Sequence, residues 1–157
     1  MAQTQSKAAA MKSAQVPLRA LMSGTPVLTL DGELPVEFLQ PGDRVLTRAG
    51  MRRLKQVEVS VVRNARVVCI SHGTLGVDRP AEDVMVSAGQ EILVRDWRAK
   101  AMFGTVAAMI PAAKLADGEY IRAVTLAEAR FFTLTFDADA VIYAGGLELA
   151  CPALVTA

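Results

Sequence analysis

The distribution of apolar residues along the chain predicts many short β-strands. Over residues 57–61, valine at every second position alternates with Glu58 and Ser60, and over residues 131–136 large apolar residues alternate with threonine. A period of two is typical of a strand with one buried face. Other short apolar runs predict further strands at Thr25–Leu30, Leu34–Leu39, Arg44–Arg48, Arg66–Ser71, Asp83–Ser87, Glu91–Val94 and Ala140–Tyr143.

Residues that favour tight turns separate these strands. Asp31-Gly32 is typical of a hairpin, Gln40-Pro41-Gly42-Asp43 of a β-turn, and Ala49-Gly50 of a second hairpin. Only Thr125–Arg130 and Leu147–Leu154 have helical character, and Pro152 weakens the second. The pattern as a whole predicts an all-β sandwich, barrel or related fold.

Length and composition indicate one folded domain. The chain has 157 residues, of which 52% are hydrophobic and 21% charged, so it has enough apolar surface for a core. Residues 1–15 are rich in Ala, Gln, Ser and Lys and have no apolar face. We therefore expect a polar N-terminal tail at 1–15 and the domain at 16–157.

The charge balance and the apolar runs disfavour several classes of partner. A net charge of +1 gives no reason to expect binding to nucleic acid or to an acidic membrane. No apolar run approaches the roughly 20 residues of a membrane-spanning helix, and the first residues do not resemble a secretory signal. We expect no membrane insertion, and a location in the cytoplasm or after leaderless secretion. The distant Cys69 and Cys151 are expected to be free.

The segment GTPVLTLDGELPVEFLQPGDRVLTRAG, residues 24–50, resembles the opening of bacterial Hint (hedgehog/intein) domains. The shared pattern is a Gly-Thr pair, a turn Gly, and then Val-Glu-x-Leu-x-x-Gly-Asp-x-Val-Leu-Thr. Residues 67–96, 110–115 and 131–150 are similar to later segments of the family, so the resemblance covers about residues 18–150. It implies a flattened, pseudo-twofold all-β horseshoe of many short strands.

The resemblance also implies a reaction, which is an acyl shift followed by self-cleavage or protein splicing. In the family a Cys, Ser or Thr attacks the carbonyl that precedes it, and this residue stands four positions before the Gly-Thr pair. That position is Ala20 here, and its methyl group cannot attack a carbonyl. The nearest hydroxyl is that of Ser23, which would require the backbone to shift by three residues.

The remaining positions that the resemblance assigns to the chemistry are also changed. The family's Thr/Ser-x-x-His motif runs from Ser87, which is retained, to Gln90, which replaces the histidine. A glutamine can donate a hydrogen bond to the reacting amide but cannot exchange a proton near neutral pH. In the closing strands, Thr133 and Asp139 occupy positions where relatives often carry histidines.

These departures predict a Hint domain that is inactive in autoprocessing and acts as a binding or structural module with a protein partner as yet unknown. The alternative is residual autoprocessing that uses Ser23 or a nucleophile outside the aligned positions. A third hypothesis is a small hydrolase that uses Cys69 and His72. Residues three apart on a strand point to opposite faces, so that pair would need a bulge.

The sequence predicts no cofactor and no metal. One histidine and two distant cysteines lack the spacing of a zinc site, and no loop places acidic residues as calcium requires. No phosphate-binding loop or dinucleotide fingerprint is present either. Trp97 lies in a polar stretch and is interpreted as a half-buried lid residue, or as an anchor for a partner if it is exposed.

Overall fold

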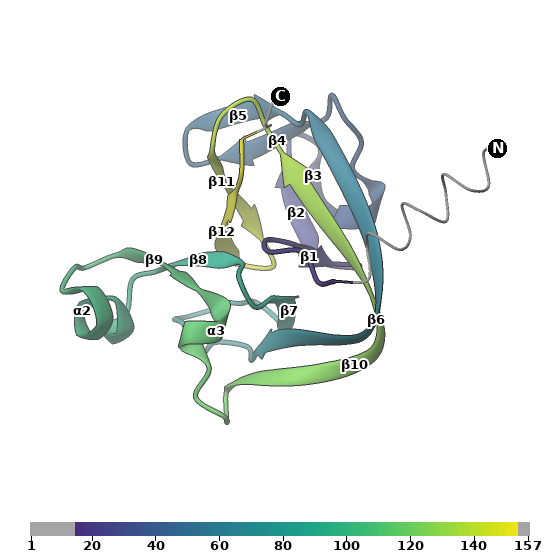
Figure 1. Cartoon of the computed structure of the whole chain (residues 1–157). Helices are drawn as coiled ribbons and strands as arrows, with labels where there is room; N and C mark the ends of the chain where they lie inside the picture. Colours follow the sequence, from purple (N-terminus) through teal and green to yellow (C-terminus); the bar gives the residue numbers. More distant parts are fainter. Residues whose placement is uncertain (1–14, 154–157) are drawn as a thin grey trace.

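The computed structural model describes residues 15–153, and its regular secondary structure is mostly β-strand (Figure 1). Two short helices and one 3-10 turn complete it. The strands are β1 Leu21–Met22, β2 Pro26–Thr29, β3 Gly32–Pro35, β4 Arg44–Thr47, β5 Gly50–Arg53, β6 Gln56–Ile70, β7 Val84–Ser87, β8 Glu91–Val94, β9 Ala108–Pro111, β10 Ile121–Thr135, β11 Ala140–Ala144 and β12 Leu147–Cys151. The helices are α2 Trp97–Phe103 and α3 Ala112–Leu115, and the 3-10 turn η1 is Val36–Phe38.

The all-β class predicted from the sequence is confirmed. The predicted tail, apart from its last residue, lies outside the described residues. None of the helices within residues 15–153 has the length and apolar character needed to cross a membrane.

The longest elements are β6 and β10, which run antiparallel beside each other and curve together along one side of the molecule (Figure 1). Each has 15 residues, and their pairing extends from Ile70 opposite Ile121 to Gln56 opposite Thr135. With β1 and β7 they close a small barrel in the order β1-β10-β6-β7. Because β1 pairs with both β10 and β7, the residues just before it lie between these two strands.

The second sheet has the order β3-β2-β4-β11-β12-β8-β9, and β5 extends it from β4. The main core lies between strands of both sheets and includes Leu21, Val27, Phe132 and Leu149. A smaller cluster, which includes Ala20 and Phe131, covers the other face of the β6–β10 ribbon. Both Phe131 and Phe132 are therefore buried, and burying each such side chain stabilises the fold by roughly 1.5–3 kcal/mol.

The predicted turns are confirmed. Asp43 N–H donates to the carbonyl of Gln40 at 3.0 Å, and Gly42 has φ of 97°. A positive φ at the third position, after proline, makes this a type II turn, which explains the Pro-Gly pair.

Two helical expectations were wrong. Residues 125–130 belong to β10, and residues 147–151 form β12, whereas residue 154 lies outside the described residues. The weak helical preference of Thr125–Arg130 is overridden because this segment pairs with β6 along its whole length. The expected strand at Leu34–Leu39 likewise ends at Pro35 and continues as η1.

The alternation at residues 57–61 identified a strand but not its buried face. Val59 and Val61 are 49% and 43% exposed, and Val62 is the residue that packs into the smaller cluster. Alternation shows that two faces differ, but the second layer decides which face is covered.

Helix α2 was not predicted, although its boundaries are visible in the sequence. The Asp96 side chain accepts a hydrogen bond from Arg98 N–H at 2.9 Å, and Gly104 ends the helix with φ of 71°. Trp97, expected as a half-buried lid, begins this helix and is 69% exposed.

Candidate functional site

The peptide bond between Arg19 and Ala20 is held by side-chain hydroxyls from two strands. The Thr133 hydroxyl, on β10, donates to the Arg19 carbonyl at 3.1 Å. The Ser87 hydroxyl oxygen, at the end of β7, accepts from Ala20 N–H at 2.9 Å. The two hydroxyls therefore bind the two ends of one peptide bond, and Ala20 is only 2% exposed.

Ser87 fixes the segment before β1 through further hydrogen bonds. Its hydroxyl donates to the Leu18 carbonyl at 3.0 Å, and its N–H donates to the Ala20 carbonyl at 3.2 Å. The turn after Ser87 approaches the same segment so closely that a Cβ added to Gly89 would lie 2.5 Å from the Leu18 carbonyl oxygen. Glycine is therefore the residue that fits at position 89.

Gln90 is part of this turn, but its side chain points elsewhere. Its N–H donates to the Ser87 carbonyl at 3.1 Å, and the residue is 2% exposed. The side-chain Nε2 donates to the carbonyls of Ala150 and Glu91 at 2.7 and 3.1 Å. The bond to Ala150 joins this turn to β12, the bond to Glu91 is local, and neither is directed at the Arg19–Ala20 bond.

The Arg19 side chain lies between two small cavities. A cavity of about 270 Å³ is lined by Arg19 and Thr133, among others. A second, of about 190 Å³, is lined by Arg19, Glu91, Asp139 and Cys151, among others. Asp139 is exposed and accepts a hydrogen bond from Ala153 N–H at 2.9 Å. It therefore lines the cavity next to Arg19, but among the described residues it hydrogen-bonds to Ala153 and not to the peptide bond itself.

The ionisable groups at this site are not suited to nucleophilic attack. Arg19 and Glu91 form an ion pair at 3.0 Å. Burial raises the pKa of the Cys151 thiol to about 12, although the nearby Arg19 guanidinium opposes the shift. A thiol with this pKa is protonated at neutral pH and is a poor nucleophile. Cys151 was predicted to be free, which is confirmed, but its place beside Arg19 was not anticipated.

The sequence matches the family model described as Hint domain over residues 19–151, which is most of the chain. This chain belongs to the Hint domain family. No curated protein matches it.

Solved structures with a similar fold include a bacterial intein-like domain from Clostridium thermocellum, which is 15% identical with a TM-score of 0.63 and covers 85% of this chain and 98% of that one. The TvoVMA intein is 11% identical with a TM-score of 0.60, covering 84% and 96%. A DnaB intein from Synechocystis sp. PCC 6803 is 10% identical with a TM-score of 0.56, covering 87% and 99%. The Hint-like all-β fold implied by residues 24–50 is therefore confirmed.

The alternative nucleophiles lie away from the held peptide bond of this Hint domain. Ser23 is exposed at the far end of β1, where its N–H donates to the Arg130 carbonyl at 3.1 Å. Its hydroxyl and the N–H of Gly24 bond to the Glu37 carboxylate, and these bonds, that of Gly24 above all, lower the pKa of Glu37. Ser23 is thus a turn residue paired with an acid that remains ionised.

Cys69 and His72 do not form a dyad. Cys69 is buried near the end of β6 and is 3% exposed. His72 lies beyond the end of that strand, and its imidazole faces the Asp78 carboxylate at 3.5 Å. Within residues 15–153 there is also no group of three or more His, Cys, Asp or Glu side chains arranged to hold a metal.

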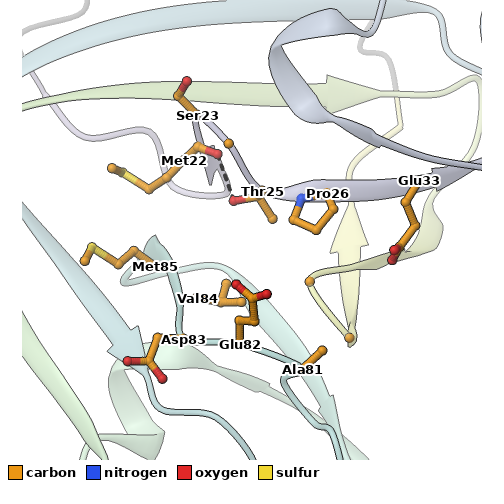
Figure 2. A pocket seen from close by; sticks show the side chains of 13 residues that line it. Met22, Ser23, Thr25, Pro26, Glu33, Ala81, Glu82, Asp83, Val84 and Met85 are labelled. Atoms are coloured by element: carbon orange, nitrogen blue, oxygen red, sulfur yellow. Dashed lines mark hydrogen bonds between the residues drawn. The ribbon is translucent and has the colours of Figure 1, made fainter.

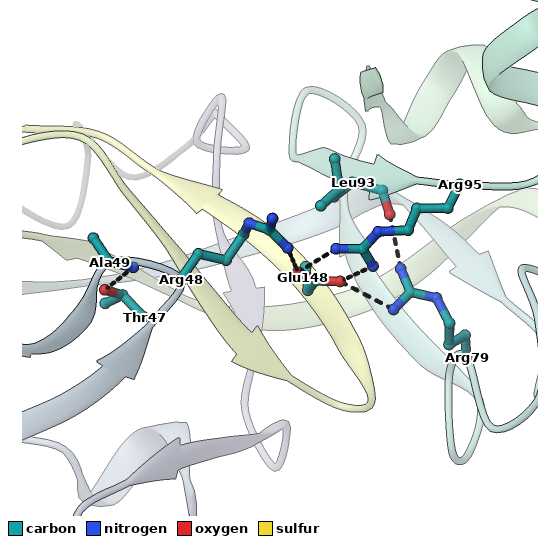
Figure 3. Close-up of polar contacts among 7 residues, drawn as sticks. All are labelled: Thr47, Arg48, Ala49, Arg79, Leu93, Arg95 and Glu148. Atoms are coloured by element: carbon teal, nitrogen blue, oxygen red, sulfur yellow. Dashed lines mark hydrogen bonds and ion pairs between the residues drawn. The ribbon is translucent and has the colours of Figure 1, made fainter. Parts of the chain in front are cut away.

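One buried charged cluster, centred on Glu148 of β12, was not predicted from the sequence (Figure 3). Glu148 is 3% exposed, and its carboxylate pairs with Arg48, Arg79 and Arg95. Arg79 also donates to the Leu93 carbonyl at 2.9 Å. Burial by itself raises the pKa of Glu148, but the hydrogen bonds from Arg95, Arg48 and Arg79 outweigh it and lower the pKa to about 2.

The Glu148 cluster supports the site indirectly. It joins the β4–β5 hairpin, the loop before β7 and the end of β8 to the strand that also receives the Gln90 side chain. The signal that could have found it is a charged residue within the apolar run Leu147–Cys151, since carboxylates in such runs are rarely buried without partners.

Proposed function

We propose that this Hint domain does not process itself and serves as a binding or structural module. The observation that carries the proposal is the Arg19–Ala20 peptide bond, which Thr133 and Ser87 hold at both ends although residue 20 has no nucleophilic atom. Both ends of the peptide bond that the family resemblance assigns to the acyl shift are held by hydroxyls, while residue 20 has no atom that could form the new bond, and this combination supports the proposal.

The other requirements of the reaction are met in part. A hydroxyl that donates to a carbonyl oxygen, as that of Thr133 does, stabilises negative charge developing there. The leaving amine also needs a proton, and Gln90 cannot exchange one near neutral pH. The chain's single histidine, His72, is exposed and faces Asp78, so it offers no replacement.

The direct test is the intact mass of the purified chain after incubation with excess thiol at neutral pH. We expect the mass of the full chain to be unchanged. Loss of residues 1–19 would show that the site is active, and loss of residues 1–22 would show that Ser23 is the nucleophile. Either loss would overturn the proposal.

A second test restores the missing groups. Ala20→Cys is expected to give a trace of thiol-induced cleavage after Arg19, because a thiol is intrinsically nucleophilic. Gln90→His is expected to give none, and the double variant more than the Cys variant but still weak cleavage, since a misplacement of about 1 Å costs roughly 100-fold.

The matched control is Ser23→Cys, which places a thiol at the far end of β1 and should leave the chain intact. Cleavage in this variant would favour the Ser23 alternative. If the double variant is no better than Ala20→Cys, position 90 does not take part in proton transfer, and its side chain serves only to join the turn to β12.

A further inference from the structure

A cavity of about 560 Å³ is lined by Met22 of β1, by the residues that follow it and by the loop that leads into β7 (Figure 2). One wall is Met22–Pro26, the opposite wall is Ala81–Met85, and the turn Gly145-Gly146 between β11 and β12 forms the floor. We call this cavity the acidic groove. A volume of this size is in the range of roughly 300–1,000 Å³ that is typical of ligand sites.

The acidic groove is held open by its floor. Gly145 N–H donates to the Pro26 carbonyl at 2.8 Å, and the Gly145 carbonyl accepts from Ala81 N–H at 3.2 Å. The two walls are therefore joined through one residue. A Cβ at Gly145 would lie 2.7 Å from a Val84 methyl group, and a Cβ at Gly146 would lie 2.6 Å from Ala81 N. The floor packs tightly against the lower wall, so the groove is formed before any ligand binds.

The lining combines apolar side chains with negative charge. Met22, Pro26, Val84 and Met85 supply apolar surface. The charged lining residues are all carboxylates, Glu33, Glu82 and Asp83, and no basic side chain lines the groove. The described residues that line the groove therefore carry a formal charge of −3.

The three carboxylates differ in their hydrogen-bond and ion-pair partners. Asp83 accepts a hydrogen bond from His72 N–H at 2.8 Å. Glu82 extends from the lower wall toward Thr25, and Glu33 lies across the groove on the opposite wall (Figure 2). Among residues 15–153 neither Glu33 nor Glu82 has an ion-pair partner, so both are available to a cation that enters the groove.

We propose that the acidic groove binds a basic, extended segment of a partner protein, with a lysine or arginine side chain inside it. The aliphatic stem of such a residue would pack on Met22, Val84 and Met85, and its charged end would reach Glu82 and Glu33. Long basic side chains commonly bury their stems while the charge meets a polar group. The groove contains none of Ala20, Ser87, Gln90, Thr133 or Asp139, so the proposal holds whether or not the chain cleaves itself.

The test is an NMR titration of the full-length, nitrogen-15-labelled chain with the acetylated and amidated peptide Gly-Leu-Lys-Leu-Gly. We expect saturable shifts of the amides of Gly24, Met85, Gly145 and Gly146. Glu82→Gln and Glu33→Gln should each weaken binding about threefold, and the double variant about tenfold, because exposed ion pairs are individually modest. Binding should also weaken as salt is raised.

The matched control is Glu119→Gln, which removes one exposed carboxylate outside the groove and should leave the dissociation constant unchanged. All variants should keep the thermal unfolding midpoint of the parent, because the substituted side chains are exposed. Equal binding by the double Gln variant, or by the peptide with glutamate in place of lysine, would overturn the proposal.

Two further probes separate the peptide from other occupants. A single lysine acetylated on its backbone nitrogen, as the methylamide, should bind more weakly than the peptide. Equal binding would mean that the groove recognises a small cation and not an extended peptide. The variant Lys7→Gln/Lys12→Gln should bind the peptide as the parent does. Tighter binding by this variant would mean that the chain's own basic N-terminal segment occupies the groove, and would overturn a partner-protein role.

Discussion

The Arg19–Ala20 site and the Glu148 cluster both bury polar groups that join distant segments, but they use opposite chemistry. At Arg19–Ala20 the contacts are neutral hydrogen bonds between backbone groups and the hydroxyls of Ser87, which accepts, and Thr133, which donates. At Glu148 one buried carboxylate is shared by three guanidinium groups. The first site can lose its reactive atom and keep its geometry, because hydroxyl-to-backbone bonds do not depend on that atom.

The two sites place different demands on the surrounding structure. Buried neutral groups need only hydrogen-bond partners, whereas a buried charge needs an opposite charge that stays ionised. We therefore expect the stability of this domain to depend more on Glu148 than on any residue of the Arg19–Ala20 site.

The largest effect is expected for Glu148→Ala. Removing the carboxylate leaves the guanidinium groups of Arg48, Arg79 and Arg95 close together without a counter-charge, which should lower the free energy of unfolding by about 3–5 kcal/mol. Equilibrium unfolding in urea at neutral pH measures it. Glu119→Ala, an exposed control, should change stability by less than about 0.5 kcal/mol. If Glu148→Ala is as stable as this control, the stability of the domain does not depend on Glu148 more than on the Arg19–Ala20 site.

The second effect is a loss of stability in acid that Glu148 causes. The folded-state pKa of Glu148 is lowered from 4.5 to about 2, so between these values the unfolded chain binds the proton more tightly. Stability should be fully present above about pH 5 and fall by roughly 3 kcal/mol as the pH decreases toward 2. In Glu148→Gln this acid-induced loss of stability should be absent. Urea unfolding of both proteins across this pH range tests it, and parallel pH profiles would contradict it.

A smaller effect is expected for Ser87→Ala. The change leaves the buried Ala20 N–H without its acceptor and the Leu18 carbonyl without its donor, which should lower the free energy of unfolding by about 2 kcal/mol. Ser60→Ala is the control, because Ser60 lines the cavity next to Thr133 but makes no hydrogen bond that depends on its hydroxyl among the described residues. If both variants have the same stability, Ser87 does not hold the peptide bond as proposed.

The smallest effect is expected for the ion pair between Arg19 and Glu91. Their side chains are 34% and 31% exposed, so solvent screens the attraction. A double-mutant cycle of Arg19→Ala and Glu91→Ala should give a coupling below about 1 kcal/mol that shrinks further at high salt. A coupling as large as the effect of Ser87→Ala would show that charge, and not only neutral hydrogen bonding, holds this segment.

Several features of the fold could be predicted because they depend on neighbouring residues. The turn at Pro41-Gly42 follows from the φ angles of these two residues, and the strand at 131–136 follows from its period of two. The family could be inferred from residues 24–50 for the same reason, since turn and strand residues lie at fixed spacings there. The position of the family's nucleophile, Ala20 in this chain, follows in the same way from its distance of four residues from the Gly-Thr pair.

The tertiary structure decided what depends on residues far apart in the chain. Gln90 lies in the turn that follows Ser87, as its sequence position implies, but its side-chain amide donates to the Ala150 carbonyl, 60 residues away. Arg48 and Glu148 are separated by 100 residues, so no local pattern indicates their pairing. Residues 125–130 became part of a strand because β6 was available to pair with them.

The sequence by itself therefore determined the all-β class, the turns and the family, and it shows an alanine at position 20. The structure decided where each polar side chain finds its partner, which face of each strand is buried, and that a separate groove collects Glu33 and Glu82. The physical reason is that backbone preferences act within a few residues. Burial and charge pairing depend on which distant segments the closed sheets bring together.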